Sequence, residues 1–146
     1  PRQSTRAVIP SIITQIMTEP ESIKIGSLHP TRDFSFIHDT VDGLVAAIKA
    51  DKGFGQVFNL GSSFEISIGK TFELISNLMG SSLRPSVDSE RVRPENSEVE
   101  RLFSSNQKAK EVLNWKPVYE GLGGFEKGLK ETISWFSDKK NLKFYK

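Results

Sequence analysis

The chain has 146 residues, no cysteine and a formal net charge of +2 at pH 7. A chain of this length forms one domain, or one domain and a tail, and can bury a sizeable core without disulfide bonds. The small charge argues against a nucleic-acid partner, the lack of a long apolar run argues against a membrane span, and the lack of cysteine excludes cysteine metal sites and is compatible with a cytoplasmic location.

The first 26 residues predict a helix followed by a strand. Apolar residues at positions 8, 9, 12, 13, 16 and 17 follow helical spacing, so we expect a helix over 6–18. Pro10 falls within its first turn, where a missing N–H costs little. The alternating sequence SIKIG at 22–26 indicates a short strand. The chain opens with PRQS rather than methionine, so we expect it to be a piece of something longer, or a processed or trimmed chain.

Residues 26–51 predict a loop, a strand and a helix. Aromatic and β-branched residues at 34, 36 and 37 indicate the strand. Asp39 and Thr40 are good residue types for a helix N-cap. We expect the helix that follows, over 41–51, to carry its apolar side chains on one face: Val41, Leu44, Val45 and Ile48.

The rest of the chain continues the alternation. Short strands are predicted at 56–61, 65–69 and 102–105, a helix at 70–80 closed by Gly80, and a charged segment at 81–100. A helix capped by Ser104 or Ser105 follows, and Gly121–Gly124 separates it from a last helix over 125–136. The fold class is therefore α/β (α+β), a small mixed domain of short strands and helices over 1–137, with a loose basic tail at 138–146.

Two arginines are candidate anion ligands. Arg32 lies at the expected junction of loop and strand, where a planar guanidinium can meet two phosphate oxygens at once. The alternative is an exposed ion pair with Asp33 or Asp39. Arg93 stands before a proline in the charged segment, which is either a solvated loop or a lid over an anion. Two arginines on separate loops could clamp a diphosphate.

Three other motifs do not predict a site. The sequence GSSFEISIGKT at 61–71 ends like a phosphate-binding loop, but Phe64 stands where that loop needs glycine, so Gly69 and Lys70 are expected to open an ordinary helix. His29 and His38 are expected to be polar loop residues, because a metal site would need a third ligand. No G-x-S-x-G motif supports a serine nucleophile.

Five stretches, in order, resemble the C-terminal half of the extended short-chain dehydrogenase/reductase family, the NAD-dependent nucleotide-sugar epimerases and dehydratases. They are PRQSTRAVIP, SIKIG, PTRDFSFIHDTVDGL, QVFNLGS and RPENSEVERLFSSNQKAKEVLNWKP. The resemblance covers residues 1–137 and looks closest to bacterial UDP-N-acetylhexosamine 4,6-dehydratase-like members. Asn114 stands where the family usually has glycine, and asparagine also adopts the left-handed C-cap conformation.

The resemblance implies a site for a nucleotide-diphosphate sugar. Arg32 and Arg93 would bind the diphosphate, and Arg91 could substitute for Arg93 because this loop is about two residues longer than in many relatives. The other residues that it implies are Ile23, Lys24 and Ile25, whose main chain would hold the base, Asn59 near the phosphate, Val8 in the pocket wall, and Arg6 and Glu98 as further contacts.

The chemistry of the resembled family also needs residues that this sequence lacks. A Gly-rich strand-turn-helix would bind NAD, and a Tyr-x-x-x-Lys pair would transfer a proton. Tyr119 is followed four residues later by Gly123, and Tyr145 is the penultimate residue. We therefore expect no cofactor in this chain and no catalysis by it alone, whereas the complete enzyme would use NAD and transiently oxidise the C4 hydroxyl of the sugar.

The resulting hypothesis is the nucleotide-sugar-binding half, for a UDP-sugar, of an NAD-dependent 4,6-dehydratase or epimerase. Its partners would be the nucleotide sugar and the missing N-terminal Rossmann domain. The apolar surface that faced that domain would favour self-association. The alternatives are a free-standing, non-catalytic binding or interaction module and a truncated gene remnant without a ligand.

Overall fold

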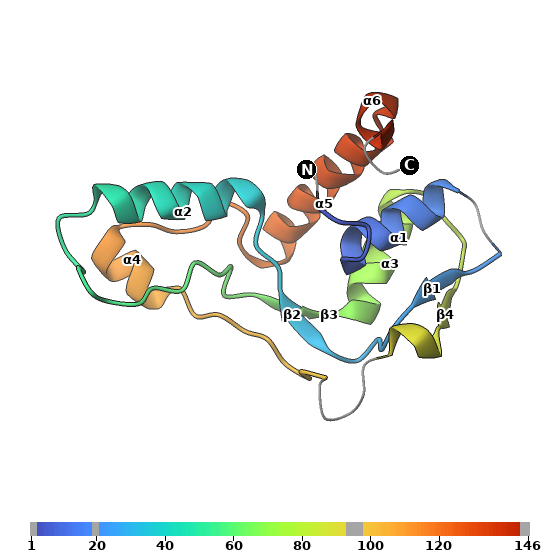
Figure 1. Ribbon diagram of the computed structural model, residues 1–146, viewed down its shortest axis with the longest axis horizontal. Helices are drawn as coiled ribbons and strands as arrows, with labels where there is room; N and C mark the ends of the chain where they lie inside the picture. Colours follow the sequence, from blue (N-terminus) through green and yellow to red (C-terminus); the bar gives the residue numbers. More distant parts are fainter. Residues whose placement is uncertain (1–2, 19–20, 93–97, 144–146) are drawn as a thin grey trace. The chain divides into compact units, whose positions relative to one another are not determined.

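The computed structural model describes residues 3–18, 21–92 and 98–143. Contacts divide the chain into two compact units: unit 1 comprises Pro1–Thr31, Ile66–Arg101 and Leu129–Lys146, and unit 2 comprises Arg32–Glu65 and Leu102–Gly128. The elements in chain order (Figure 1) are α1 (Val8–Met17), β1 (Ile23–Ile25), β2 (Thr31–Asp33), α2 (Ile37–Lys49), β3 (Glu65–Ser67), α3 (Ile68–Leu78), β4 (Pro85–Val87), η1 (Ser89–Arg91), α4 (Gln107–Leu113), α5 (Gly121–Ser137) and α6 (Lys139–Leu142).

Unit 1 is built on a parallel pair of strands, β1 and β4, with Lys24 opposite Ser86. Helix α1 contacts both β1 and α3. The expected helix over 6–18 and strand over 22–26 are confirmed by α1 and β1. The core is rich in isoleucine, and its buried members are Ile12, Ile13, Ile16, Ile23, Ile25, Ile66, Ile68, Phe72, Ile75, Leu129 and Phe136.

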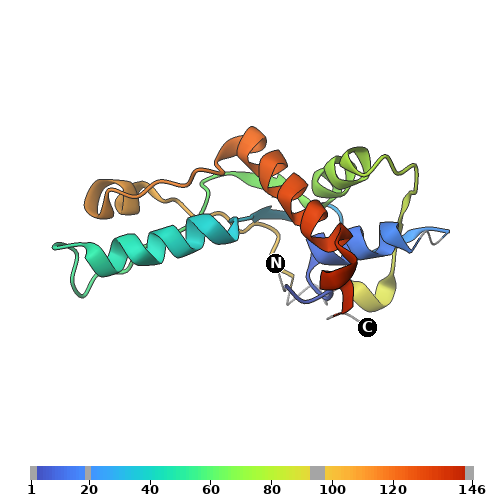
Figure 2. The same cartoon turned by 90° about the horizontal axis from the view of Figure 1, so that it is seen from above.

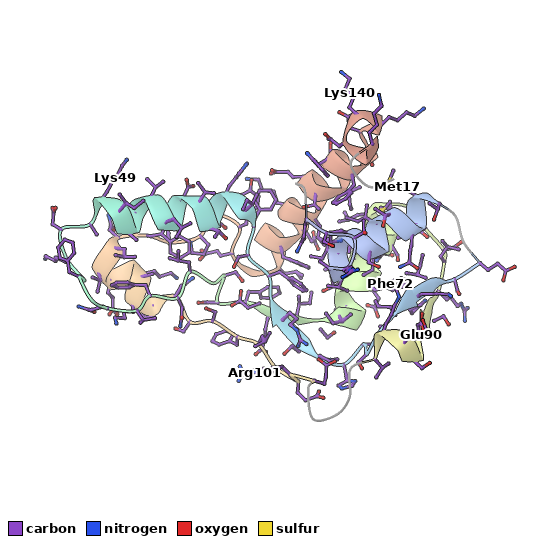
Figure 3. The ribbon with its side chains drawn as sticks, viewed as in Figure 1. Met17, Lys49, Phe72, Glu90, Arg101 and Lys140 are labelled. Carbon is purple, nitrogen blue, oxygen red and sulfur yellow. The ribbon has the colours of Figure 1, made fainter. Side chains whose placement is uncertain are left out.

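Helix α3 has clear start and stop signals. The Ser67 hydroxyl accepts the Lys70 N–H at 3.1 Å and so caps the first turn. Gly80 takes φ +65°, a left-handed conformation that glycine adopts without strain, and ends the helix as expected. Gly69 and Lys70 therefore lie in the first turn of α3, as expected. Figure 3 labels Phe72, a buried residue of this helix.

Unit 2 packs α2 and α4 around one small apolar cluster. Its buried members are Ala109, Leu113 and Trp115, and the residues against them are Ala46, Ala50, Phe58, Leu60 and Val112. Gly43 allows the close approach, because a Cβ there would lie 2.9 Å from Leu60 and 3.1 Å from Trp115. Figures 1 and 2 show α2 beside α4.

The strand and helix start after Gly26 lie earlier than predicted. The strand is β2 at 31–33, and Phe34 and Phe36 follow it rather than form it. Phe34 stacks on Phe125 with ring centroids 5.5 Å apart, so burial against an aromatic partner explains the apolar pattern. Helix α2 begins at Ile37 without a side-chain cap, so the prediction of Asp39 or Thr40 as its N-cap is wrong.

Two predicted strands are absent. Residues 56–61 and 102–105 form no strand, although Arg101 makes a single parallel bridge with Thr31. Both segments have strand-like composition, but a strand exists only where a neighbouring strand accepts its hydrogen bonds. Conversely, the charged segment predicted as a loop contributes β4 and η1. The strand predicted at 65–69 is β3, which pairs with β2.

The C-terminal helices differ from the expectation at their ends. Asn106, not Ser104 or Ser105, is the N-cap of α4, and Asn114 ends α4 with φ 51° and ψ 35°, the left-handed conformation predicted for it. Helix α5 begins at Gly121, so the glycine run is its first turn rather than a separator. The segment expected to be a loose tail forms α6 over Lys139–Leu142. Among the described residues, none of the helices has the length and apolarity to traverse a bilayer.

Candidate functional site

Arg32 lies on β2 next to an aspartate that is held firmly in place. Arg32 itself is half-buried. Asp33 accepts three hydrogen bonds: Oδ1 takes the Ser62 N–H at 2.9 Å and the Ser62 hydroxyl at 2.6 Å, and Oδ2 takes the Ser104 N–H at 3.2 Å. Hydrogen bonds to a carboxylate are among the stronger ones in proteins. The backbone that carries Arg32 is therefore fixed by both oxygens of its neighbour.

The segment after Asn59 is tied to the start of α4. Asn106 donates from Nδ2 to the Gly61 carbonyl at 2.9 Å, and its N–H donates to the Ser63 hydroxyl at 2.9 Å. A Cβ on Gly61 would collide with Ser104. Asn59 itself is exposed. Asn59 therefore lies two residues before Gly61, whose position is fixed by Asn106 and Ser104.

Asp39 is a buried structural carboxylate. Only 3% of it is exposed, and it accepts the N–H groups of Val118 at 2.8 Å and Tyr119 at 2.9 Å. The Tyr119 ring packs on Phe36 with centroids 4.2 Å apart, and the Lys127 Nζ lies 4.4 Å from the centroid of the Tyr119 ring. Asp39 therefore fixes the loop before α5, a role that its helix-capping residue type did not reveal.

In unit 1, the main chain of β1 forms hydrogen bonds along both of its edges. The Ile23 N–H donates to the Arg84 carbonyl, and the Ile25 carbonyl accepts the Asp88 N–H. Lys24 faces the opposite edge, where the side chain of Gln15 takes both its N–H and its carbonyl. Sequence reasoning missed Gln15. The available signal was a polar amide four residues after Ser11 on the same helix.

Arg91 is anchored to unit 1 at two points. Its Nη1 donates to the Ser11 hydroxyl at 3.1 Å, and its Nε lies 3.7 Å from the Asp88 carboxylate. Glu90, labelled in Figure 3, precedes it on η1. Gly26 lets the two backbones meet, since a Cβ there would lie 2.6 Å from the Arg91 carbonyl oxygen. Arg91 thus points at α1 through fixed contacts.

The remaining predicted residues are placed only in part. Val8 is the first residue of α1 and half-buried, Arg6 is exposed just before it, and Glu98 is half-buried. Arg93 lies outside the described residues. Unit 1 therefore brings Val8, Arg91 and the strand Ile23–Ile25 around α1, while Arg32 and Asn59 belong to unit 2.

The titratable residues of the described chain form no metal centre. No group of three or more His, Cys, Asp or Glu residues is placed to hold an ion within residues 3–18, 21–92 and 98–143. His29 instead pairs with Glu100, with its Nε2 3.0 Å from the carboxylate oxygen on an exposed surface.

Comparison with known proteins identifies relatives of this chain. The family model described as GDP-mannose 4,6 dehydratase matches residues 1–132. The UDP-glucuronate 4-epimerase of Thermodesulfobacterium geofontis is 32% identical over 130 residues, covering 88% of this chain and 36% of that protein. The UDP-N-acetyl-alpha-D-glucosaminuronate decarboxylase of Bacillus cytotoxicus is 32% identical over 136 residues, covering 92% and 41%.

Solved structures share the fold. The epimerase Mth375 of Methanothermobacter thermautotrophicus superposes with a TM-score of 0.81 at 28% identity, covering 95% of this chain and 39% of that one. The dTDP-glucose 4,6-dehydratase of Bacillus anthracis, in complex with NAD, has a TM-score of 0.80 at 23% identity, covering 99% and 42%. The chain therefore spans about two fifths of the length of these relatives.

Proposed function

Since the chain belongs to the family of GDP-mannose 4,6-dehydratase, within the NAD-dependent nucleotide-sugar epimerases and dehydratases, we propose that it is the nucleotide-sugar-binding part of such an enzyme. The ligand would be a UDP-sugar and the reaction of the complete enzyme a 4,6-dehydration or an epimerisation. The absence of cysteine is compatible with a reducing compartment, and we propose the cytoplasm.

The observation that carries this proposal is the held position of Arg32. Ser62 and Ser104 together fix both oxygens of Asp33, so the guanidinium next to it starts from a rigid strand. Rigid placement reduces the conformational entropy lost when a ligand binds. A guanidinium offers two parallel N–H groups to a phosphate, which an ammonium cannot match. Binding the remote diphosphate would position the sugar for reaction elsewhere in the enzyme.

We propose that NAD binds outside this chain. The sequence contains neither a Gly-rich strand-turn-helix nor a Tyr-x-x-x-Lys pair. Gly123, not lysine, stands four residues after Tyr119, whose ring packs on Phe36. We therefore assign this chain the binding of the sugar nucleotide and no step of hydride or proton transfer.

The proposal also includes a partner surface on unit 2. The apolar stripe of α2 is largely solvent-exposed, with Ile48 84% exposed, and Phe54 and Val57 beyond the helix are exposed too. Exposed apolar patches of this kind mark interaction sites. Relatives are more than twice as long as this chain. We propose that the NAD-binding part of the enzyme covers this surface, and that isolated chains associate through it.

Isothermal titration of the chain with UDP and with UDP-N-acetylglucosamine tests the binding role. We expect binding in the micromolar to millimolar range that Arg32→Ala weakens about tenfold or more, because each charge-assisted contact contributes roughly 1.5–3 kcal/mol. Arg93→Ala should weaken it similarly. Lys49→Ala removes the same charge from the exposed end of α2 and should change nothing. Equal binding by the Arg32→Ala variant and the parent chain would contradict the proposal.

Activity restored by a separately produced NAD-binding domain tests the partner role. We expect NAD-dependent turnover of the UDP-sugar only when both polypeptides are present. A charge on the α2 stripe, as in Leu44→Glu, should abolish this turnover, whereas the neighbouring exposed substitution Ala47→Glu should preserve it. Turnover that Leu44→Glu leaves intact would place the contact elsewhere.

A further inference from the structure

The last two helices of unit 1 form a pocket where α5 ends and α6 begins (Figure 1). Its volume of about 560 Å³ lies within the range of small-molecule sites. The residues that line it are Lys130, Glu131, Ser134, Trp135, Asp138 and Asn141. None of them is among the residues implied for the nucleotide sugar, so a different ligand would occupy this pocket.

The indole of Trp135 lines this pocket from a fixed position. The side chain is half-buried, and its ring meets the Phe136 ring edge-on with centroids 4.9 Å apart. Phe136 is fully buried in the core of unit 1, so the neighbour of the indole cannot move freely. The face of an indole carries a negative potential and attracts a cation more strongly than the rings of tyrosine or phenylalanine do.

Two carboxylates flank Trp135 along the chain. Glu131 precedes it by four residues and Asp138 follows it by three, a spacing that brings side chains together on one side of a helix. Lys130 also lines the pocket, whereas Lys139 and Lys140 follow Asp138 but do not line it. With two carboxylates against one ammonium, the lining carries an excess of negative charge.

Asp138 and Asn141 each present an oxygen while their other polar atom is bonded within the chain. The Asp138 Oδ1 accepts the Lys140 N–H at 2.8 Å, and the Asn141 Nδ2 donates to the Trp135 carbonyl at 2.9 Å. Within the described residues, the Asp138 Oδ2 and the Asn141 Oδ1 have no hydrogen-bond partner. The internal bonds therefore hold both side chains in place, and two acceptor oxygens are left for a donor.

We propose that this pocket binds a small primary ammonium ion. Such a cation has three N–H donors, which match the oxygen-bearing side chains of Glu131, Asp138 and Asn141, and its alkyl stem would lie on the indole of Trp135. Hydrogen bonds from a charged donor to a carboxylate are stronger than neutral ones. Because Lys130 lies in the same lining, a ligand with one positive charge is favoured over a diamine with two. The inference goes beyond the proposed function, since it does not involve the nucleotide sugar.

Tryptophan fluorescence of the whole chain tests the proposal. The chain has two tryptophans, and Trp115 is buried in unit 2, so a ligand on Trp135 should change the emission of one of them. We expect butylammonium at pH 7 and constant ionic strength to give a saturable change, with a dissociation constant of about 1–10 mM for so small a ligand. Butan-1-ol has the same length without the charge and should give no saturable change. Trp135→Phe should remove the response, which would assign it to this indole.

Two variants remove a carboxylate charge from the pocket with little change in shape. Glu131→Gln keeps the length of the side chain, and Asp138→Asn keeps the N-cap of α6, because asparagine caps a helix about as well as aspartate. Each should raise the dissociation constant of butylammonium about tenfold or more. The matched control is Glu90→Gln, which removes the same charge from an exposed position of η1 outside the pocket and should bind like the wild-type chain.

The outcomes separate a ligand site from an ordinary solvated helix face. Putrescine, a dication of similar length, should bind more weakly than butylammonium, and Lys130→Met should narrow that difference. A linear response to butylammonium and butan-1-ol alike would overturn the inference, and so would unchanged binding by both Glu131→Gln and Asp138→Asn. Arg32→Ala, which tests the binding of the nucleotide sugar, should leave amine binding unchanged, so the failure of one claim does not decide the other.

Discussion

Helices α1 and α2 both carry a stripe of apolar side chains, but one stripe is buried and the other is exposed. The stripe of α1 is buried in unit 1, where Ile12 is 1% and Ile13 0% exposed. The stripe of α2, in unit 2, stays in solvent. The buried side of α2 is instead the small-residue side, where Gly43 and Ala46 approach the cluster around Trp115.

The difference depends on whether other segments of the chain pack against each stripe. In unit 1, β1 and α3 come from other parts of the same chain and contact α1. In unit 2 the cluster around Trp115 uses one side of α2 only, and the segment 56–61 has a strand-like sequence without forming a strand. Both features of unit 2 fit a layer that a partner completes. The predictions below test this contrast, starting with the largest expected effect.

The first prediction compares two isoleucines. Ile13→Ala should lower the free energy of unfolding by about 2–5 kcal/mol, because it leaves a cavity in a full core. Ile48→Ala should change it by less than about 0.5 kcal/mol, because its side chain already lies in water. Urea denaturation followed by circular dichroism measures both. Similar losses from the two variants would mean that the α2 stripe is covered within the chain.

Sequence patterns located elements well where local rules decide them. The spacing of the isoleucines predicted α1, the alternation at 22–26 predicted β1, and glycine at position 80 predicted the end of α3. Asn114 was correctly given a left-handed conformation. These features depend on residues within a few positions of one another, so the sequence contains the full cause.

Several of the failures depend on partners distant in sequence. Residues 56–61 and 102–105 have the composition of strands but no ladder partner, and β4 pairs with β1 although its sequence is poor in apolar residues. Asp39 was assigned to a cap because the residues that donate their N–H groups to its carboxylate, Val118 and Tyr119, lie 79 and 80 positions away in the sequence. For the same reason Gln15 could not be identified as the partner of Lys24.

The second prediction concerns the packed side of α2. Gly43→Ala should destabilise the chain by about 1–3 kcal/mol, because the added methyl would lie 2.9 Å from Leu60. The matched control is Gly123→Ala in α5, where a Cβ meets nothing within 4 Å and helix propensity should add up to about 1 kcal/mol of stability. Thermal denaturation should therefore move in opposite directions. A neutral Gly43→Ala would show that the cluster in unit 2 is loosely packed.

The third prediction concerns the carboxylate that holds unit 2 together. Asp39→Asn keeps one acceptor for two N–H groups and should cost about 1–2 kcal/mol, because one buried donor loses its partner. Asp42 is exposed and lies three residues later on α2, so Asp42→Asn should leave the free energy of unfolding almost unchanged. Hydrogen exchange of the Val118 and Tyr119 amides provides a second readout. Unchanged protection of both amides would contradict the structural role of Asp39.

Sedimentation equilibrium tests most directly the central claim that unit 2 presents a surface made for a partner. The wild-type chain should associate as its concentration rises. The double substitution Leu44→Glu with Ile48→Glu should leave a monomer, whereas Ala47→Glu should associate like the wild-type chain. A wild-type chain that stays monomeric at every concentration, or association that the double substitution leaves unchanged, would contradict the claim.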